Sequence, residues 1–194
     1  NNGLQDIFVR DRVLGLTTRV SVSSGGAQAD GASFDPIISA DGRFIAFASS
    51  ATDLVADDNN GRPDIFVHDR STGATVRTSV AADGAEADQA SAGPAISGDG
   101  RYVAFVSLAS NLISGDDNNL YDVFVKDLSS GAVERLEARR PSPGEGRTID
   151  ISADGRYVAF SSVANDLIAG DANGLEDVFL VDRDLNQIER VTIG

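Results

Sequence analysis

Residues 38–47 read ISADGRFIAF, and nearly the same ten residues return as ISGDGRYVAF at 96–105 and ISADGRYVAF at 151–160. A second phrase, DIFVRDR or a close variant, keeps the same spacing, and its four copies begin at Asp6, Asp64, Asp122 and Asp177. The intervals between these copies are 58, 58 and 55 residues. Repeats of this length predict an array of like units that bury their apolar faces by stacking on one another.

Composition narrows the possible partners. The 194 residues carry a net charge of −14, and 41% of them are hydrophobic. Such an acidic surface repels a phosphate backbone, so we expect no nucleic acid partner. The apolar residues come in short runs, none near the ~20 residues of a membrane helix, so we expect no membrane insertion. Cysteine is absent, which excludes disulfides and thiolate metal sites.

Each unit is predicted to contain four short strands. In the unit of about residues 23–81 these are expected at 36–39, 43–49, 64–69 and 75–80. Asp41-Gly42 separates the first two, as in the tight turn of a hairpin. The second and third strands are apolar at nearly every position, which indicates burial on both faces, whereas the fourth alternates. No segment has the 3.6-residue period of a helix.

Four antiparallel strands with doubly buried inner strands are typical of a propeller blade packed between two others. The motif S-x-D-G-R-[FY]-[IV]-A-F resembles the TolB-like, WD-repeat-like β-propeller repeat, and the resemblance extends over essentially the whole chain. It implies an all-β fold of four-stranded antiparallel blades, in a single repeat array over residues 1–194. The expected boundaries are a half blade at 1–22 and blades at about 23–81, 82–139 and 140–194.

The predicted total is 14 strands, or about three and a half blades, whereas propellers usually close with four to eight. An open array exposes apolar blade faces that need a partner. We expect that partner to be further blades of the same polypeptide or other copies of the chain. The chain lacks methionine and opens inside a repeat at Asn1, so sequence upstream is also expected.

An acidic loop precedes the third strand of every unit. Its pattern is D-x-N-[GN]-x-x-D, and the candidate ligands are Asp58, Asn60, Asp64, Asp116, Asn118, Asp122, Asp171, Asn173 and Asp177. Oxygen ligands at alternate positions, a sharp turn and a further carboxylate are features of calcium loops. The spacing resembles the last seven positions of the D-x-D-x-D-G-x-x-D calcium loops.

The loops depart from that pattern at the first ligand, where Ala56, Ser114 and Ala169 stand. Water could complete the calcium shell, as could the polar residues five positions upstream of each loop's first aspartate: Asp53, Asn111 and Asp166. Two alternatives stay open, another cation or a metal-free turn in which Asp and Asn oxygens accept backbone N–H groups.

Candidate catalytic residues are few. His68 is the only histidine, and its counterparts in the other units are Arg10, Lys126 and Val181, which predicts a solvent-facing position. With one histidine and no cysteine, a nucleophilic triad has little to be built from. Asp41, like its counterparts Asp99 and Asp154, sits beside a turn glycine and is expected to serve the turn. A pair of hydrolytic carboxylates stays open, because sequence does not give their separation.

The regularities concern the building and joining of blades, and none marks one blade as an active centre. We therefore predict no enzyme but an extracellular or cell-surface scaffold or binding module, stabilised by calcium, within a larger ring or a homo-oligomeric or filamentous assembly. Its ligand could be a protein or a glycan. The alternative is the propeller portion of a larger secreted hydrolase or lyase whose catalytic residues lie outside this chain.

Overall fold

The computed structural model describes residues 2–139, 149–171 and 174–192. Every regular element in these ranges is a β-strand. A two-stranded sheet holds β1 (Phe8–Asp11) and β2 (Leu16–Arg19). The second sheet, in the order β3-β4-β5-β6, holds β3 (Ser33–Ile38), β4 (Phe44–Ser49), β5 (Asp64–Asp69) and β6 (Ala74–Arg77).

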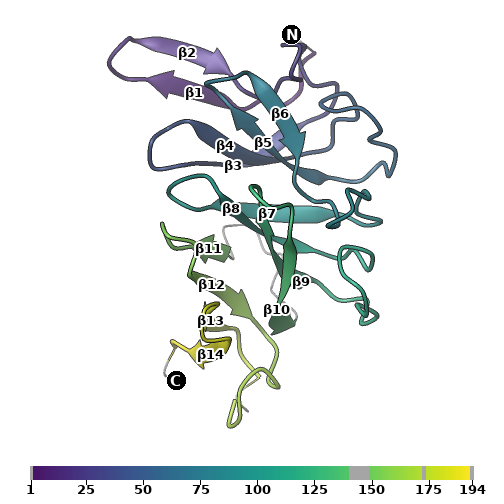
Figure 1. The fold of residues 1–194 in the computed structure, drawn as a ribbon, viewed down its shortest axis with the longest axis vertical. Coiled ribbons are helices and arrows are strands. Elements are labelled where there is room, and N and C mark those ends of the chain that lie inside the picture. The colour runs from purple at the N-terminus through teal and green to yellow at the C-terminus, as the bar shows by residue number, and fades with distance from the viewer. Residues whose placement is uncertain (1, 140–148, 172–173, 193–194) are drawn as a thin grey trace.

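The other two sheets repeat this order. One holds β7 (Ser91–Ile96), β8 (Tyr102–Ser107), β9 (Asp122–Asp127) and β10 (Val133–Arg139). The last holds β11 (Ile149–Ile151), β12 (Tyr157–Ser162), β13 (Asp177–Asp182) and β14 (Gln187–Arg190). All neighbouring strands are antiparallel, and the four sheets follow one another along the long axis in Figure 1. The predicted all-β architecture of four-stranded propeller blades is confirmed.

The Asp-Gly motif turns the chain between the first and second strand of each blade. In the turn from β3 to β4, the N–H of Gly42 donates to Ser39 O, and Oδ1 of Asp41 accepts from the N–H of Arg43. Gly42 has φ 73°, whereas Asp41 keeps a negative φ. The turn thus needs a left-handed residue only at its glycine, which has no Cβ to clash there. Asp41 serves the turn, as expected.

The first strands of successive blades lie side by side. Contacts join β3 to β7 and β7 to β11. The Asp-Gly turns are also linked, because the N–H of Ala40 donates to Gly98 O and the N–H of Gly98 donates to Ala153 O. The blades therefore fan out from a common inner edge, where β3, β7 and β11 lie.

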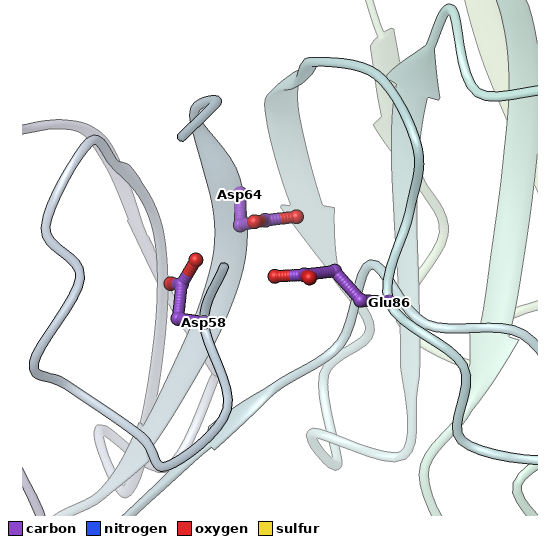
Figure 2. A group of neighbouring side chains, drawn as sticks. All are labelled: Asp58, Asp64 and Glu86. Carbon is purple, nitrogen blue, oxygen red and sulfur yellow. The ribbon is translucent and has the colours of Figure 1, made fainter. Parts of the chain in front are cut away.

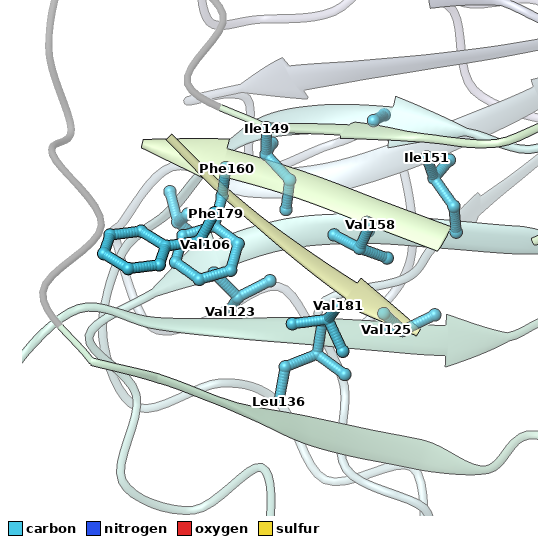
Figure 3. Packing of buried hydrophobic residues seen from close by; sticks show 12 residues of the cluster. Val106, Val123, Val125, Leu136, Ile149, Ile151, Val158, Phe160, Phe179 and Val181 are labelled. Atoms are coloured by element: carbon cyan, nitrogen blue, oxygen red, sulfur yellow. The ribbon is translucent and has the colours of Figure 1, made fainter. Parts of the chain in front are cut away.

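The core consists of apolar layers between blades. In the layer shown in Figure 3, Val106, Val123 and Val125 of the β7–β10 sheet pack against Val158 and Phe160 of the β11–β14 sheet. Within each whole blade, a phenylalanine of the second strand stacks on one of the third; the ring centroids are 5.9, 5.9 and 5.7 Å apart for Phe47–Phe66, Phe105–Phe124 and Phe160–Phe179. Strands β4, β5, β8 and β9 are buried on both faces, as predicted.

The two end sheets depart from this prediction. Burial alternates along β12 and β13, and Val178 is 37% exposed. Phe8 of β1 is 55% exposed, although its counterparts Phe66, Phe124 and Phe179 are completely buried. The reason is that an end sheet has a neighbouring blade on one face only. No helix in the described ranges has the length and apolar content needed to cross a bilayer.

Candidate functional site

The acidic loop before β5 brings two of its predicted residues together. Asp58 lies in the loop between β4 and β5, and Asp64 is the first residue of β5. Both side chains are buried, with 2% and 0% exposure. A third carboxylate, that of Glu86, comes from the connection between β6 and β7, which an isolated bridge between Val80 and Glu86 holds in place. Figure 2 shows the three carboxylates converging, and each offers an oxygen within 4.8 Å of the others.

Arg77 of β6 reaches into this cluster. Its Nη1 lies 3.3 Å from Asp58 Oδ1 and 3.8 Å from Asp64 Oδ2, and it also pairs with Glu86 Oε1. The guanidinium therefore lies beside all three carboxylates and neutralises part of their negative charge. Because three carboxylates face one guanidinium, the cluster keeps excess negative charge when all of them are ionised.

This charge imbalance perturbs the acidic groups. Burial, together with the charge of Asp64, raises the pKa of Asp58 to about 6. Burial likewise raises the pKa of Asp64, although the Ser79 hydroxyl and the Asn60 amide oppose this. For Glu86 burial acts in the same direction but is outweighed, because the backbone N–H of Asn59 and the charge of Arg77 lower its pKa.

The pairing of a fourth-strand arginine with the aspartates before or at the start of the third strand, here called the clasp, recurs in every sheet. Arg19 lies 3.6 Å from Asp6, Arg135 lies 2.9 and 3.7 Å from Asp116 and Asp122, and Arg190 lies 3.0 and 3.5 Å from Asp171 and Asp177. Each arginine belongs to the fourth strand of its blade and follows the first aspartate of the third strand by 13 residues. The clasp thus ties each acidic loop to the outermost strand.

The asparagines take a different role from that of a ligand pointing at a cation. Asn60 donates its amide NH₂ to Asp64 Oδ2 at 2.8 Å and to Ala87 O at 2.9 Å, while its Oδ1 accepts from the N–H of Arg62. Asn118 has the same pattern: it donates to Asp122 Oδ2 at 2.7 Å and accepts from the N–H of Leu120. Both residues therefore shape the turn and support the carboxylate. Asn173 lies outside the described residues.

The upstream residues considered as additional ligands bond elsewhere. Asp53 accepts from the backbone N–H of Asp30, and Asn111 accepts from that of Asp88. Asn111 also donates to Glu86 O. These contacts attach each long loop to the preceding connection between blades. The third carboxylate of the Asp58 cluster is therefore that of Glu86 and not that of an upstream residue.

One feature of the Asp58 cluster fits a cation. Asp58 Oδ2 is buried and has no hydrogen-bond partner in the structure. A buried ionised oxygen without a partner is costly, and a hard cation would satisfy it. Three carboxylates from two segments make up a set of oxygen donors suited to a divalent ion, so a metal can be held here. The described residues contain no other group of three such side chains within this distance of one another.

The position of the single histidine was predicted wrongly. His68 is only 6% exposed, and its Nδ1 lies 2.9 Å from Thr75 Oγ1. Lys126, at the same position of the next blade, is also 6% exposed and donates to Val80 O and Ala81 O. A long basic side chain can thus be buried where backbone carbonyls of the preceding connection accept hydrogen bonds from it. Burial lowers the pKa of both side chains.

Sequence reasoning missed Arg77 and Glu86. The arginine had a readable signal, because an arginine 13 residues after the strand-three aspartate occurs in all four copies. Glu86 had none, since the first unit carries Gln28 at that position. Gln28 donates to Asn2 and to Asp6, so it contacts the carboxylate of Asp6 without adding charge.

The chain resembles solved propellers. TolB from Acinetobacter baumannii matches 96% of this chain with a TM-score of 0.55 and 20% identity. The tricorn protease matches 96% with a TM-score of 0.60 and 17% identity, and an oligogalacturonate lyase in complex with manganese matches 96% with 0.57 and 13%. The matched parts are 37%, 20% and 41% of those chains. No family model and no curated protein matches this sequence.

These likenesses establish the fold as that of a TolB-like β-propeller, in agreement with the sequence motif. The chain spans a fifth to about two fifths of the length of the three proteins. The three proteins are TolB, a protease and a lyase, so the fold does not determine the activity.

Proposed function

We propose that this chain is a non-catalytic scaffold or binding module, built of propeller blades and located outside the cell or at its surface. The observation that carries the proposal is the repeated clasp between the acidic loop and the fourth-strand arginine. Here the buried acids of all four sheets are paired with arginine, which suits a role in holding loops to strands.

Calcium is proposed to stabilise the first complete blade through Asp58, Asp64 and Glu86. Glu86 takes the place that the sequence assigned to Asn60. The support is the excess negative charge and the unpartnered Oδ2 of Asp58. When bound, the ion would supply the positive charge that Arg77 supplies only in part. The Asp116 and Asp171 loops, where two carboxylates face one arginine, remain weaker candidates.

Thermal unfolding tests the calcium part. Metal-stripped chain is titrated with calcium, and its unfolding midpoint is followed by circular dichroism. The midpoint is expected to rise, because ligand at a hundredfold its dissociation constant stabilises a fold by about 2.7 kcal/mol. Glu86→Gln should abolish the response, and the matched variant Asp116→Asn should retain it. An unchanged wild-type midpoint would remove calcium from the proposal.

The non-catalytic part has its own test. Purified chain is assayed on peptide and oligogalacturonide substrates, and no turnover is expected. Turnover that Asp58→Asn or Glu86→Gln abolishes would overturn the scaffold role. The second candidate is the propeller portion of a secreted hydrolase or lyase whose catalytic residues lie outside this chain, which the likeness to the tricorn protease and to the lyase favours. A G-x-S-x-G domain in the parent reading frame would support that candidate.

The end sheets are proposed to be completed by further blades, from the same polypeptide or from other copies of the chain. The motivation is the exposure of Phe8 and Val178, whose counterparts in the inner sheets are buried. A protein or glycan ligand would bind to the assembled surface.

A further inference from the structure

At the junction between the third and fourth sheets, one arginine makes both an ion pair and a cation–π contact. Arg183, which follows β13, donates through Nε and Nη2 to Glu134 Oε2 at 2.9 and 2.8 Å, and its guanidinium lies 4.7 Å from the centroid of the Tyr102 ring. It also bonds to Gly155 O. Glu134 and Tyr102 belong to the third sheet. One blade thus receives the arginine of the next through a carboxylate and an aromatic ring.

The preceding junction is apolar at the corresponding positions. Leu128 replaces the arginine, Phe44 replaces the tyrosine and Val76 replaces the glutamate. Leu128 and Phe44 are partly buried and pack against the same hydrophobic cluster. At these two junctions, the residue that enters and the residues that receive it change together.

The last sheet carries the same receiving pair. Tyr157 and Glu189 correspond to Tyr102 and Glu134, and they line a hollow of about 380 Å³ on the outer part of this sheet. Arg156 lies 4.9 Å from the centroid of the Tyr157 ring, as Arg101 does beside Tyr102 at 4.7 Å. The hollow thus contains the same two types of side chain that hold Arg183 at the preceding junction.

The first sheet carries the matching arginine. Arg12 follows β1 as Arg183 follows β13, and it is exposed. Phe8, at the position of Phe179, is exposed on the same strand. Charge complements this match: residues 8–19 hold three arginines and one aspartate, whereas residues 177–190 hold four acidic residues and two arginines.

The apolar pattern of the last sheet also fits a partner of two strands. Its outer half keeps apolar residues, Val178, Leu180 and Val191, where the third sheet has Val123, Val125 and Leu136. Its inner half has become polar, with Asp150 and Ser161 in place of Ala95 and Val106. The β1–β2 sheet corresponds to the outer two strands of a blade, which are the strands that would face this apolar half.

We propose that the outer half of the β11–β14 sheet binds the β1–β2 sheet of a second copy of this chain, head to tail, with Arg12 of that copy held between Tyr157 and Glu189. This deepens the proposed function, because it names the partner of the end sheets. The contact is heterologous, so it joins copies into a ring if the rotation closes and into a filament if it does not.

Sedimentation velocity over a range of concentrations tests this contact. The wild-type chain is expected to associate, and Arg12→Glu or Glu189→Arg should each weaken association at least about tenfold, as loss of a charge-assisted pair predicts. Arg62→Glu, which changes an exposed arginine elsewhere, is the charge-matched control and should associate as the wild type does. Circular dichroism confirms that each variant is folded.

Mixing the two weakened variants provides the decisive arm. The Arg12→Glu chain keeps the native receiving end and the Glu189→Arg chain keeps the native donor end, so the mixture should form a heterodimer through one native contact with wild-type affinity. A wild-type chain that stays monomeric at every concentration would overturn the proposal, as would association that neither substitution weakens. Neither result bears on calcium binding or turnover, so this proposal and the proposed function fail separately.

Discussion

Gly100 lies directly beneath the ring of Phe44 from the preceding blade: a Cβ on Gly100 would stand 2.1 Å from Cδ2 of that ring. Gly155 has the same relation to Tyr102, at 2.2 Å. The glycine of each Asp-Gly turn therefore serves two purposes. It takes up a positive φ within its own blade, and it leaves room for the aromatic residue that begins the second strand of its neighbour.

Substitution of this glycine should separate the two effects. Gly42 has the same turn and φ, but the nearest atom to its Cβ position is an Arg70 nitrogen at 3.8 Å. Gly42→Ala should cost about 1 kcal/mol through backbone strain alone, and Gly100→Ala roughly 2–4 kcal/mol because the ring must also move. Urea unfolding measures both. Equal losses would mean that the ring gives way without cost.

Removal of the clasp should be most costly where three carboxylates meet. Arg77→Gln leaves Asp58, Asp64 and Glu86 facing one another, and loss of a buried partner typically costs 3–5 kcal/mol. The matched variant Arg19→Gln loses a single pair of a side chain that is 29% exposed, so about 1 kcal/mol or less is expected. Chemical denaturation in metal-free buffer gives both values. A comparable loss of stability in the two variants would show that repulsion among the three carboxylates adds nothing to the cost.

The same cluster predicts an unusual response to pH. The pKa of Asp58 is about 6 in the folded chain, against about 3.9 for an unfolded aspartate. The folded state thus binds more protons between these values, and the free energy of unfolding falls as pH rises through 6. In metal-free buffer, stability should increase on the order of 2 kcal/mol from pH 7.5 to pH 5, with a contribution from Asp122, whose pKa burial also raises to about 6.

Two variants check the origin of this slope. Asp58→Asn should stabilise the chain at pH 7.5 and flatten its pH profile. Asp69→Asn should destabilise the chain at pH 7.5 and leave the change in stability between pH 7.5 and pH 5 intact. The reason is that the Arg43 guanidinium holds the pKa of Asp69 below its usual range. The stability from Asp69 is present above pH 4 and is lost as the solution is acidified further. A wild-type profile without change from pH 7.5 to 5 would contradict the raised pKa values.

Removal of a strand phenylalanine should cost more stability inside the array than at its end. Phe105 is completely buried and stacks on Phe124, so Phe105→Ala is expected to cost about 3–5 kcal/mol. Phe8 is 55% exposed, and Phe8→Ala should cost less than about 1 kcal/mol in dilute solution, where association is weak. Thermal unfolding at low protein concentration compares the two. A large loss for Phe8→Ala in the isolated chain would mean that β1 is covered there.

Much of the blade was readable from local pattern. Continuous apolar runs such as FIAFA predicted strands buried on both faces, and the Asp-Gly pairs marked the turns between them, because strand burial and turn geometry depend on a few adjacent residues. The acidic loops were equally visible. The partners of these loops were harder to predict. Arg77 and Glu86 are distant in sequence from Asp58, and they reach it through strand pairing and through the connection between blades.

The sequence by itself determined the repeat, the all-β blade and the candidate acidic residues, because a pattern written several times at a constant interval specifies one local structure several times. Only the tertiary structure decided which charges face one another and which faces stay open. It placed an arginine among the carboxylates, buried His68 against Thr75 and left the Tyr157–Glu189 hollow exposed. These features depend on the stacking of one blade on the next, which brings together residues with no fixed relation along the chain.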